Sequence, residues 1–381
     1  MDKKLVSKIM TFKSGNFAFS RVYDKVAVEK LLIEAKTLRE AVEDMPILPK
    51  WASQLEEEVI RRSIYSTAAL EGNPLSEQQV GAIIEADRAG QFTARAEREI
   101  SNLKLAYQAC RLLAIPKGAF LLSEKLIQSM HKTITAGIEH ATNVPGSYRE
   151  HSVKVGNSEH GGTYTPPKIR ADIEKLMREF VVWLNSPEAL AEEPLVRAGL
   201  AHFHLGAIHP FADGNGRTAR LMEAVILRAD GIKHAPEMLS KYYYNHMDDY
   251  YWAFTRSERN KENDLTPFLT FVLNAFLVSL REIKQKIGYI IRRLALRDYI
   301  AYLRGQKAIT MRQYDLLGIL VEYFQPFTLN DLFTSPHFVA LYREVSDRTA
   351  RRDIKKLLDL RLLLETEKGK YSTNFNVLNK A

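Results

Sequence analysis

The sequence feature that most restricts the fold is Gly214-Asn215-Gly216, a short run set between two helix-periodic segments, residues 194–208 and 217–229. Glycine and asparagine at this density disfavour the interior of a helix, so a loop is expected here. Such a loop can turn several backbone N–H groups toward one point. The helix that follows adds its unpaired N–H groups and the positive end of its dipole. The segment therefore predicts a cradle for an anion such as phosphate.

The side chains beside this loop carry chemistry that suits phosphate. Arg217 and Arg220 lie three residues apart, on one face of the helix, where two guanidinium groups can hold phosphate oxygens. Asp213 is an oxygen ligand suited to a Mg²⁺ ion that bridges phosphates. His209 can accept a proton near neutral pH. The alternative is a glycine-rich turn capped by structural arginines, but the coincidence of these groups favours a site.

Most of the chain before residue 288 has apolar positions at three- and four-residue spacing, which indicates helices. Residues 151–167 are different, because two short β-prone runs surround their glycines and predict a β-hairpin. A capping box of Ser76 with Gln79 begins one helix. Other helices are expected at about 55–70, 123–137, 168–184, 246–258 and 265–287. The sequence thus predicts an all-α body with one small β-hairpin.

Residues 309–381 follow another pattern. Helices are expected at 311–323, near Thr328 and from Ser346, and a hairpin at 362–375 around the basic tip Lys368-Gly369-Lys370. Three helices followed by a basic-tipped hairpin are typical of a winged helix-turn-helix domain.

Charge is distributed unevenly along the chain. The net charge is +8, and residues 281–381 contain 19 Lys and Arg against 11 Asp and Glu, so the last quarter holds the whole excess. This asymmetry favours a C-terminal module that faces an anionic partner, although a solvated basic surface is the alternative.

Composition also bears on the cellular compartment. Cys110 is the single cysteine, which excludes internal disulfides and cysteine-based zinc sites and fits a reducing cytoplasm. The most apolar stretch, residues 265–280, contains polar residues and proline and is shorter than a membrane span. No secretory signal is recognisable at the start of the chain. We therefore expect a cytoplasmic protein without a membrane segment.

The segment His209-Pro210-Phe211-Ala212-Asp213-Gly214-Asn215-Gly216-Arg217-Thr218-Ala219-Arg220 resembles the signature of the Fic (filamentation induced by cAMP) family, His-x-Phe-x-Asp/Glu-Gly-Asn-Gly-Arg-x-x-Arg. Every fixed position matches. The resemblance extends over about residues 55–285. It includes Pro145–Arg149, the stretch 153–167, which is similar to the family's flap, and Tyr250-Tyr251.

The resemblance implies an enzyme that binds ATP and Mg²⁺ and transfers AMP to a Ser, Thr or Tyr hydroxyl of a target protein. His209 is then the base, and Asp213 holds Mg²⁺. The ATP phosphates are expected at Gly214, Asn215, Gly216, Arg217, Thr218, Ala219 and Arg220. The target segment and the adenine are expected at Val153, Lys154, Val155, Gly156, Tyr250 and Tyr251. A relative that phosphorylates its target has Lys at the position of Gly216, so glycine here argues against that activity.

Residues 67–72, Thr67-Ala68-Ala69-Leu70-Glu71-Gly72, resemble the family's inhibitory motif, Ser/Thr-x-x-x-Glu-Gly/Asn. Thr67 and Glu71 are four residues apart, hence on one helix face. Standing alone, the pattern fits a solvated glutamate near a helix end. Beside the signature, it implies that Glu71 pairs with Arg220 and keeps the γ-phosphate of ATP from binding productively. In some relatives the same glutamate helps to remove AMP, which leaves a de-AMPylase as an alternative.

The segment that begins at Ser346 resembles the recognition helix of bacterial winged-helix repressors. Its cations could meet DNA phosphates or base edges, and they are Arg348, Arg351, Arg352 and Lys355. Protein binding or dimer formation through the same domain is the alternative, and a homodimer is plausible. A DNA-binding regulator whose Fic core only senses nucleotide is the rival to the enzyme.

The expected organisation has four parts. They are an N-terminal helical region with the inhibitory helix at about 55–72 (1–115), a Fic core with the flap at 151–167 (116–287), a linker helix (288–308) and a winged helix-turn-helix domain (309–381).

Overall fold

The computed structural model describes residues 5–86, 92, 94–113, 120–233, 235–323 and 325–378. These residues divide into two compact units, Met1–Asp44 with Ala52–Ile283 and Met45–Trp51 with Lys284–Ala381. The division falls inside one helix, near the boundary expected at 287. The boundary expected at 115–116 lies outside the described residues.

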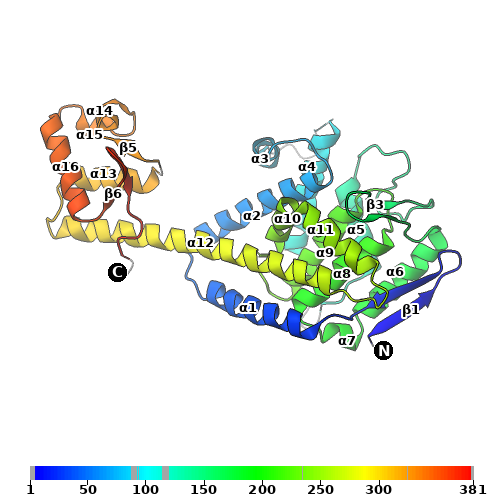
Figure 1. The fold of residues 1–381 in the computed structure, drawn as a ribbon. Helices are drawn as coiled ribbons and strands as arrows, with labels where there is room; N and C mark the ends of the chain where they lie inside the picture. Colours follow the sequence, from blue (N-terminus) through cyan, green and yellow to red (C-terminus); the bar gives the residue numbers. More distant parts are fainter. Residues whose placement is uncertain are drawn as a thin grey trace. The chain divides into compact units, whose positions relative to one another are not determined.

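The elements of the first unit are mostly helices (Figure 1). In chain order they are β1 (Val6–Met10), β2 (Asn16–Ser20), α1 (Lys25–Glu43), α2 (Pro49–Leu70), α3 (Glu77–Glu85), α4 (Arg95–Leu112), α5 (Glu124–Thr135), β3 (Val155–Asn157), β4 (Gly162–Tyr164), α6 (Arg170–Leu184), α7 (Pro187–Leu190), α8 (Pro194–Ile208), α9 (Asn215–Ala229), α10 (Ala235–Asn245), α11 (Met247–Glu258) and α12 (Thr266–Gly305).

The predicted helices and hairpin are confirmed. Helices α5, α6, α8, α9 and α11 begin and end within two residues of the predicted segments. Ser76 and Gln79 form the expected capping box of α3. Strands β3 and β4 pair antiparallel, with Val155 opposite Tyr164, as the predicted hairpin. Helix α2 begins earlier than expected, at Pro49, since proline is well tolerated in the first helical turn.

The expectation of a single hairpin in this body is wrong. Strands β1 and β2 form a second antiparallel pair, joined by a turn in which Gly15 has φ +80°. Distant residues hold this hairpin in place. The Asp172 carboxylate accepts hydrogen bonds from the N–H groups of Phe12 and Lys13, and Phe19 stacks on Trp183. Because these partners lie far along the chain, the local pattern does not reveal the hairpin.

Helix α8 forms the centre of the first unit, and nearly all of its residues are buried. It packs along α9, as the two neighbouring helices in Figure 1 show. Its glycines allow close approach of other helices. A Cβ at Gly199 would lie 2.9 Å from Leu269 of α12, and one at Gly206 would lie 2.9 Å from Phe254 of α11. The junction of α8 and α9 is therefore fixed from several sides.

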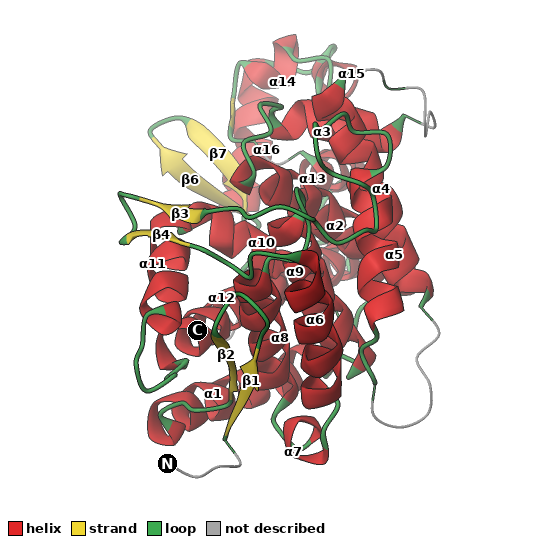
Figure 2. Ribbon diagram, turned by 90° about the vertical axis from the view of Figure 1, so that its right-hand side faces the viewer, coloured by secondary structure: helices red, strands yellow, loops and turns green. Residues whose placement is uncertain are grey.

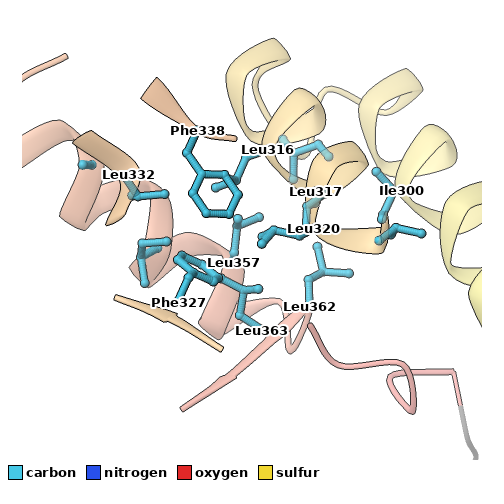
Figure 3. Close-up of a cluster of buried hydrophobic side chains, with 14 of the residues drawn as sticks. Ile300, Leu316, Leu317, Leu320, Phe327, Leu332, Phe338, Leu357, Leu362 and Leu363 are labelled. Carbon is cyan, nitrogen blue, oxygen red and sulfur yellow. The ribbon is translucent and has the colours of Figure 1, made fainter. Parts of the chain in front are cut away.

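The second unit contains the end of α12 and a small α+β module. Its further elements are α13 (Met311–Glu322), β5 (Phe327–Thr328), α14 (Asp331–Thr334), α15 (Val339–Tyr342), α16 (Asp347–Asp359), β6 (Leu363–Glu367) and β7 (Lys370–Thr373). The strands form an antiparallel sheet in the order β5-β7-β6. Leucines and phenylalanines of the helices and sheet form its core (Figure 3).

Helix α12 is, within the described part of the chain, the one helix long and apolar enough by composition to cross a membrane. Of its most apolar 18-residue window, 61% is buried inside the structure. A core helix passes the same test, so this property is weak support for a membrane span.

Candidate active site at the junction of α8 and α9

The chain reverses between α8 and α9 through the segment 209–214. His209 ends α8 in the left-handed region, with φ 49° and ψ 59°, and Gly214 precedes α9 with φ 78°. The Asn215 side chain closes the turn, because its Oδ1 accepts from the Phe211 N–H at 2.9 Å and its Nδ2 donates to the Phe211 carbonyl at 2.8 Å. Asn215 and Gly216 belong to the first turn of α9 rather than to the predicted loop, so the free N–H groups are those of a helix N-terminus.

Arg149 fixes the other side of the turn. Its backbone N–H donates to the Pro210 carbonyl at 2.9 Å, and its Nε donates to the His209 carbonyl at 2.8 Å. The side chain is buried, and burial lowers its pKa to about 10. A guanidinium bound to main-chain carbonyls thus holds His209 in its left-handed conformation.

His131 of α5 supports the same turn by contacting Phe211 and Asp213. Its ring stacks on Phe211, with centroids 3.6 Å apart. The Gly146 N–H donates to its Nδ1 at 2.9 Å, so the proton lies on Nε2, which donates to the Asp213 carbonyl at 2.9 Å. Burial lowers the pKa of His131 to about 4, so the ring is neutral. Nothing in the local sequence around residue 131 predicts this role.

His209 is poised as a neutral base. Burial and the nearby Arg149 lower its pKa to about 4, against a hydrogen bond to the Gly206 carbonyl and the charges of Glu71 and Asp213. One ring nitrogen is thus oriented by the Gly206 carbonyl, and the other has no hydrogen-bond partner among the described residues and can accept a proton.

Asp213 lies at the start of the cradle. Its Oδ1 accepts from the Gly214 N–H at 2.6 Å and from Arg217 Nη2 at 2.8 Å, while its Oδ2 meets only Arg95, at 3.4 Å, among the described residues. Burial opposes ionisation, but Arg217 and the Gly214 N–H outweigh it and lower the pKa. Asp213 is therefore an ionised carboxylate with one oxygen largely free.

Arg217 faces the cradle with unused donors. Its side chain is almost fully buried, and its Nε and Nη1 have no hydrogen-bond partner among the described residues. Glu99 lies 3.7 Å from Nη1. A buried guanidinium with free donors indicates a place for an anion.

Arg220 is occupied by the end of α2. Its Nε donates to Thr67 Oγ1 at 2.8 Å, and its Nη2 donates to Glu71 Oε1 at 2.6 Å. Arg220 is 2% exposed and the Glu71 side chain 32%. Burial raises the pKa of Glu71, but Arg220 and Arg217 outweigh it, so the net pKa is lowered and the carboxylate is charged. The structure thus joins residues 149 positions apart in the chain.

Two features hold Glu71 over the cradle. Gly72, with φ +83°, ends α2 and turns the chain, and the Asn73 side chain that follows donates to Glu99 at 2.9 Å. Gly216 supplies the space, because a Cβ there would collide with Glu71 Oε1. The sequence pattern does not reveal this second reason for glycine at position 216.

The remaining predicted residues lie around this centre. Thr218 Oγ1 donates to the Gly214 carbonyl at 2.8 Å, and Ala219 is buried in α9. Tyr250 is buried and hydrogen-bonded to His202, at 3.0 Å, whereas Tyr251 is half-buried and lies against His160 of the β3–β4 hairpin.

The hairpin itself lies beside α11 (Figure 2). Val153 and Lys154 precede β3, and Val155 and Gly156 are in it. His160, at its tip, bonds Asp248 of α11 at 2.8 Å.

Comparison with known proteins identifies the domain. Residues 121–227 match the model of the Fic/DOC family. The chain is 28% identical over 235 residues to a protein named protein adenylyltransferase Fic from Culex quinquefasciatus and 29% identical over 218 residues to one from Aedes aegypti. These matches cover 61% and 57% of the chain but only 43% and 40% of the relatives.

Solved structures show the same fold. A Fic family protein from Desulfovibrio desulfuricans G20 has a TM-score of 0.56 at 21% identity, and the match covers 93% of this chain and 97% of that one. Fic-1 from C. elegans has a TM-score of 0.53 at 24% identity, over 68% of this chain and 72% of that one. Residues 121–227 therefore match the Fic/DOC family, and the structure has the helical Fic fold with a small β-hairpin.

Proposed function

We propose that this chain, with its Fic/DOC domain at 121–227, transfers AMP from ATP to a Ser, Thr or Tyr hydroxyl of a target protein. The relatives named protein adenylyltransferase support this activity. The observation that carries it is the neutral His209, held beside a helix N-terminus that also presents Arg217 and Arg220. A base beside an anion cradle suits attack of a hydroxyl on a phosphate.

The transfer follows from these groups. His209 takes the proton of the target hydroxyl, and the oxygen forms a bond to the α-phosphorus of ATP. The bond from that phosphorus to the bridging oxygen breaks, and pyrophosphate leaves. The N-terminus of α9 and the two arginines hold the phosphates, so that positioning and charge neutralisation supply the catalysis.

The residues present also fit a Mg²⁺ ion. Asp213 is ionised and has one largely free oxygen, which is the kind of ligand that Mg²⁺ takes beside phosphates. Asp213 would hold the ion, and the ion would neutralise phosphate charge.

We further propose that Glu71 inhibits the reaction. While Arg220 is bound to Glu71 and Thr67, it is not available to the γ-phosphate. The same glutamate could orient a water for removal of AMP, which keeps a de-AMPylase as the alternative direction.

The single buried cysteine remains our reason to place the protein in the cytoplasm.

The position of the label tests the reaction class. With ATP labelled on the α-phosphate, the Glu71→Gly variant should transfer label to itself or to a protein of a cell lysate, and the mass of the product should rise by one AMP. With ATP labelled on the γ-phosphate, it should transfer none. Transfer of γ-label would instead indicate phosphorylation and would contradict the proposal.

The pH dependence of the Glu71→Gly variant should follow His209. A base works only while unprotonated, so kcat/KM should fall as the pH drops through the pKa of His209, which is about 4 in the free protein. Between pH 6 and 8, kcat/KM should therefore show no fall caused by protonation of His209. A fall centred near 6.5, the usual histidine value, would show that burial of His209 does not set its basicity.

The second unit supports a further candidate function, DNA binding. Helix α13, strand β5, helices α14 to α16 and strands β6 and β7 follow one another as in a winged helix. Buried Asp353 fixes α16 by accepting hydrogen bonds from Arg312 at 2.7 Å and Tyr342 at 3.2 Å.

The exposed face of α16 carries Arg348, Arg351, Arg352 and Lys355. Of these, only Arg351 has an ion-pair partner among the described residues, namely Asp347. We propose that this face meets phosphates, in a monomer or a homodimer.

The salt dependence of DNA binding tests this face. If four cations meet phosphates, log K should fall against log salt with a slope of about −3.6. Replacing Arg348, Arg352 and Lys355 with alanine should make the slope shallower by about 3. Fluorescence anisotropy with a labelled DNA duplex measures the slope. Arg304→Ala, on α12, is the control and should change the slope little. Binding that is insensitive to salt would contradict the proposal.

A further inference from the structure

A cavity of about 270 Å³ lies in the first unit, beside the end of the β3–β4 hairpin. Its walls are the β1–β2 hairpin, the stretch 164–167 that begins with the last residue of β4, the end of α11 and part of α8. The volume is below the usual range of sites for drug-sized ligands, so a nucleotide does not fit, whereas one side chain or a small molecule does.

One charged group lines this cavity. Among the described residues that line it, Glu258 is the only acidic one, and none is lysine or arginine. In the part of the chain that the structure describes, the Glu258 carboxylate forms no hydrogen bond or ion pair. Burial raises its pKa, and Arg259 opposes this rise. The Arg259 guanidinium lies toward the hairpin, where a Cβ at Gly162 would be 3.2 Å from its Nη2. A half-buried carboxylate without a partner favours a cation.

The other lining groups are compatible with a cation. His204 is neutral, because burial lowers its pKa to about 4. The aromatic residues Phe17, Tyr164 and Phe203 line the same space, and aromatic rings attract cations. Asn16 and Thr165 add polar side chains without hydrogen-bond partners among the described residues.

We propose that this cavity binds an ammonium or guanidinium group, with Glu258 as its counter-ion. The cavity begins where β4 ends, so a basic side chain of a protein segment held along the hairpin could enter it. This source rests on the proposed function, because it requires a protein target. The other source of the same chemistry is a free amine.

Binding of small probes tests the site without any transfer reaction. Saturation-transfer NMR on the full chain should detect n-butylammonium and ethylguanidinium with dissociation constants on the order of 1 mM. The neutral alcohol 1-butanol, which matches n-butylammonium in length, should bind at least about tenfold more weakly. Equal binding of the alcohol, or no saturable binding of either cation, would overturn the proposal.

Variants locate the binding. Glu258→Gln should weaken both cations about tenfold, whereas Glu262→Gln, an exposed acid in the next loop, should leave them unchanged. Thr165→Arg places a tethered guanidinium at the cavity and should displace the probes, which keeps the test valid if Glu258→Gln does not fold. Probe binding that is unchanged in both variants would show that the cations bind elsewhere.

A second experiment distinguishes the two sources of the cation, a side chain of a target protein and a free amine. Peptides with one serine and one lysine at varied spacing are compared by anisotropy with the same peptides carrying norleucine in place of lysine. If lysine strengthens binding to wild type but not to Glu258→Gln, the source is a target protein. If only butylammonium and spermidine depend on Glu258, the source is a free amine. AMP transfer is not needed for either result, so failure of the proposed function would not be mistaken for failure of this site.

Discussion

Replacing Glu71 with glycine should raise the initial rate of AMP transfer about 30-fold over wild type. The variant frees Arg220, which in the resting protein is bound to Glu71 Oε1 at 2.6 Å. A partly buried ion pair of this kind inhibits the reaction by about 2 kcal/mol. Its removal therefore corresponds to a gain of about 30-fold in rate. The measurement is incorporation of α-labelled ATP, or self-labelling where no target is known.

A matched control separates this effect from damage to helix α2. Glu57 lies in the same helix, is exposed and has no ion-pair partner among the described residues, so Glu57→Gly introduces the same residue without touching Arg220. It should destabilise the helix by about 1 kcal/mol and leave the transfer rate unchanged. Equal activation by both variants would mean that loosening α2, rather than freeing Arg220, releases activity.

The structure also predicts an intermediate variant. Glu71→Gln keeps the shape of the side chain and can still accept a hydrogen bond from Arg220, but it carries no charge. Its rate should lie between those of wild type and Glu71→Gly. A rate equal to that of wild type would show that shape, and not charge, blocks the site.

Replacing His209 with alanine in the Glu71→Gly background should lower the transfer rate by about 10² to 10⁴, the usual contribution of a general base. His209 is neutral, and its ring is oriented by the Gly206 carbonyl, so the residue can act as a base without a change of protonation or position. Its backbone is held by Arg149, which bonds the His209 carbonyl and not the ring, so the turn should survive the substitution.

Nucleotide binding provides the control for this prediction. Binding of ATP to the His209→Ala variants, measured by calorimetry, should be similar to that of their parents, because the proposal assigns the phosphates to Arg217 and Arg220 and not to His209. His337→Ala, an exposed histidine of the second unit, should leave both rate and binding unchanged. A His209→Ala variant that retains full activity would remove His209 from the mechanism.

The site could be predicted from the sequence where its parts are local. The cradle depends on a loop and the first turn of α9, and both are encoded within twelve consecutive residues. Arg217 and Arg220 share a face because helical spacing places them there. The motif at Thr67 and Glu71 is local as well, and the structure places it on Arg220.

The supporting residues could not be predicted, because their roles depend on tertiary contacts. His131 and Arg149 bond the 209–214 turn from 60 or more positions away. No local pattern marks His131, and the resemblance that includes Pro145–Arg149 does not reveal what Arg149 bonds. The β1–β2 hairpin is held by Asp172 and Trp183 in α6. Helix α12 continues past residue 287 to Gly305, because Gly288 is followed by no proline and a lone glycine does not end a helix, so the sequence offers no sharp boundary there.

We propose that His209 acts as the base in AMP transfer and that Glu71 inhibits the transfer by holding Arg220. The most direct measurement compares four proteins, namely wild type, Glu71→Gly, His209→Ala and the double variant, by α-label incorporation and intact mass. We expect added AMP in the Glu71→Gly sample, little in wild type and none above background in either protein that lacks His209. Equal labelling of wild type and Glu71→Gly, or labelling that persists in the double variant, would contradict the account.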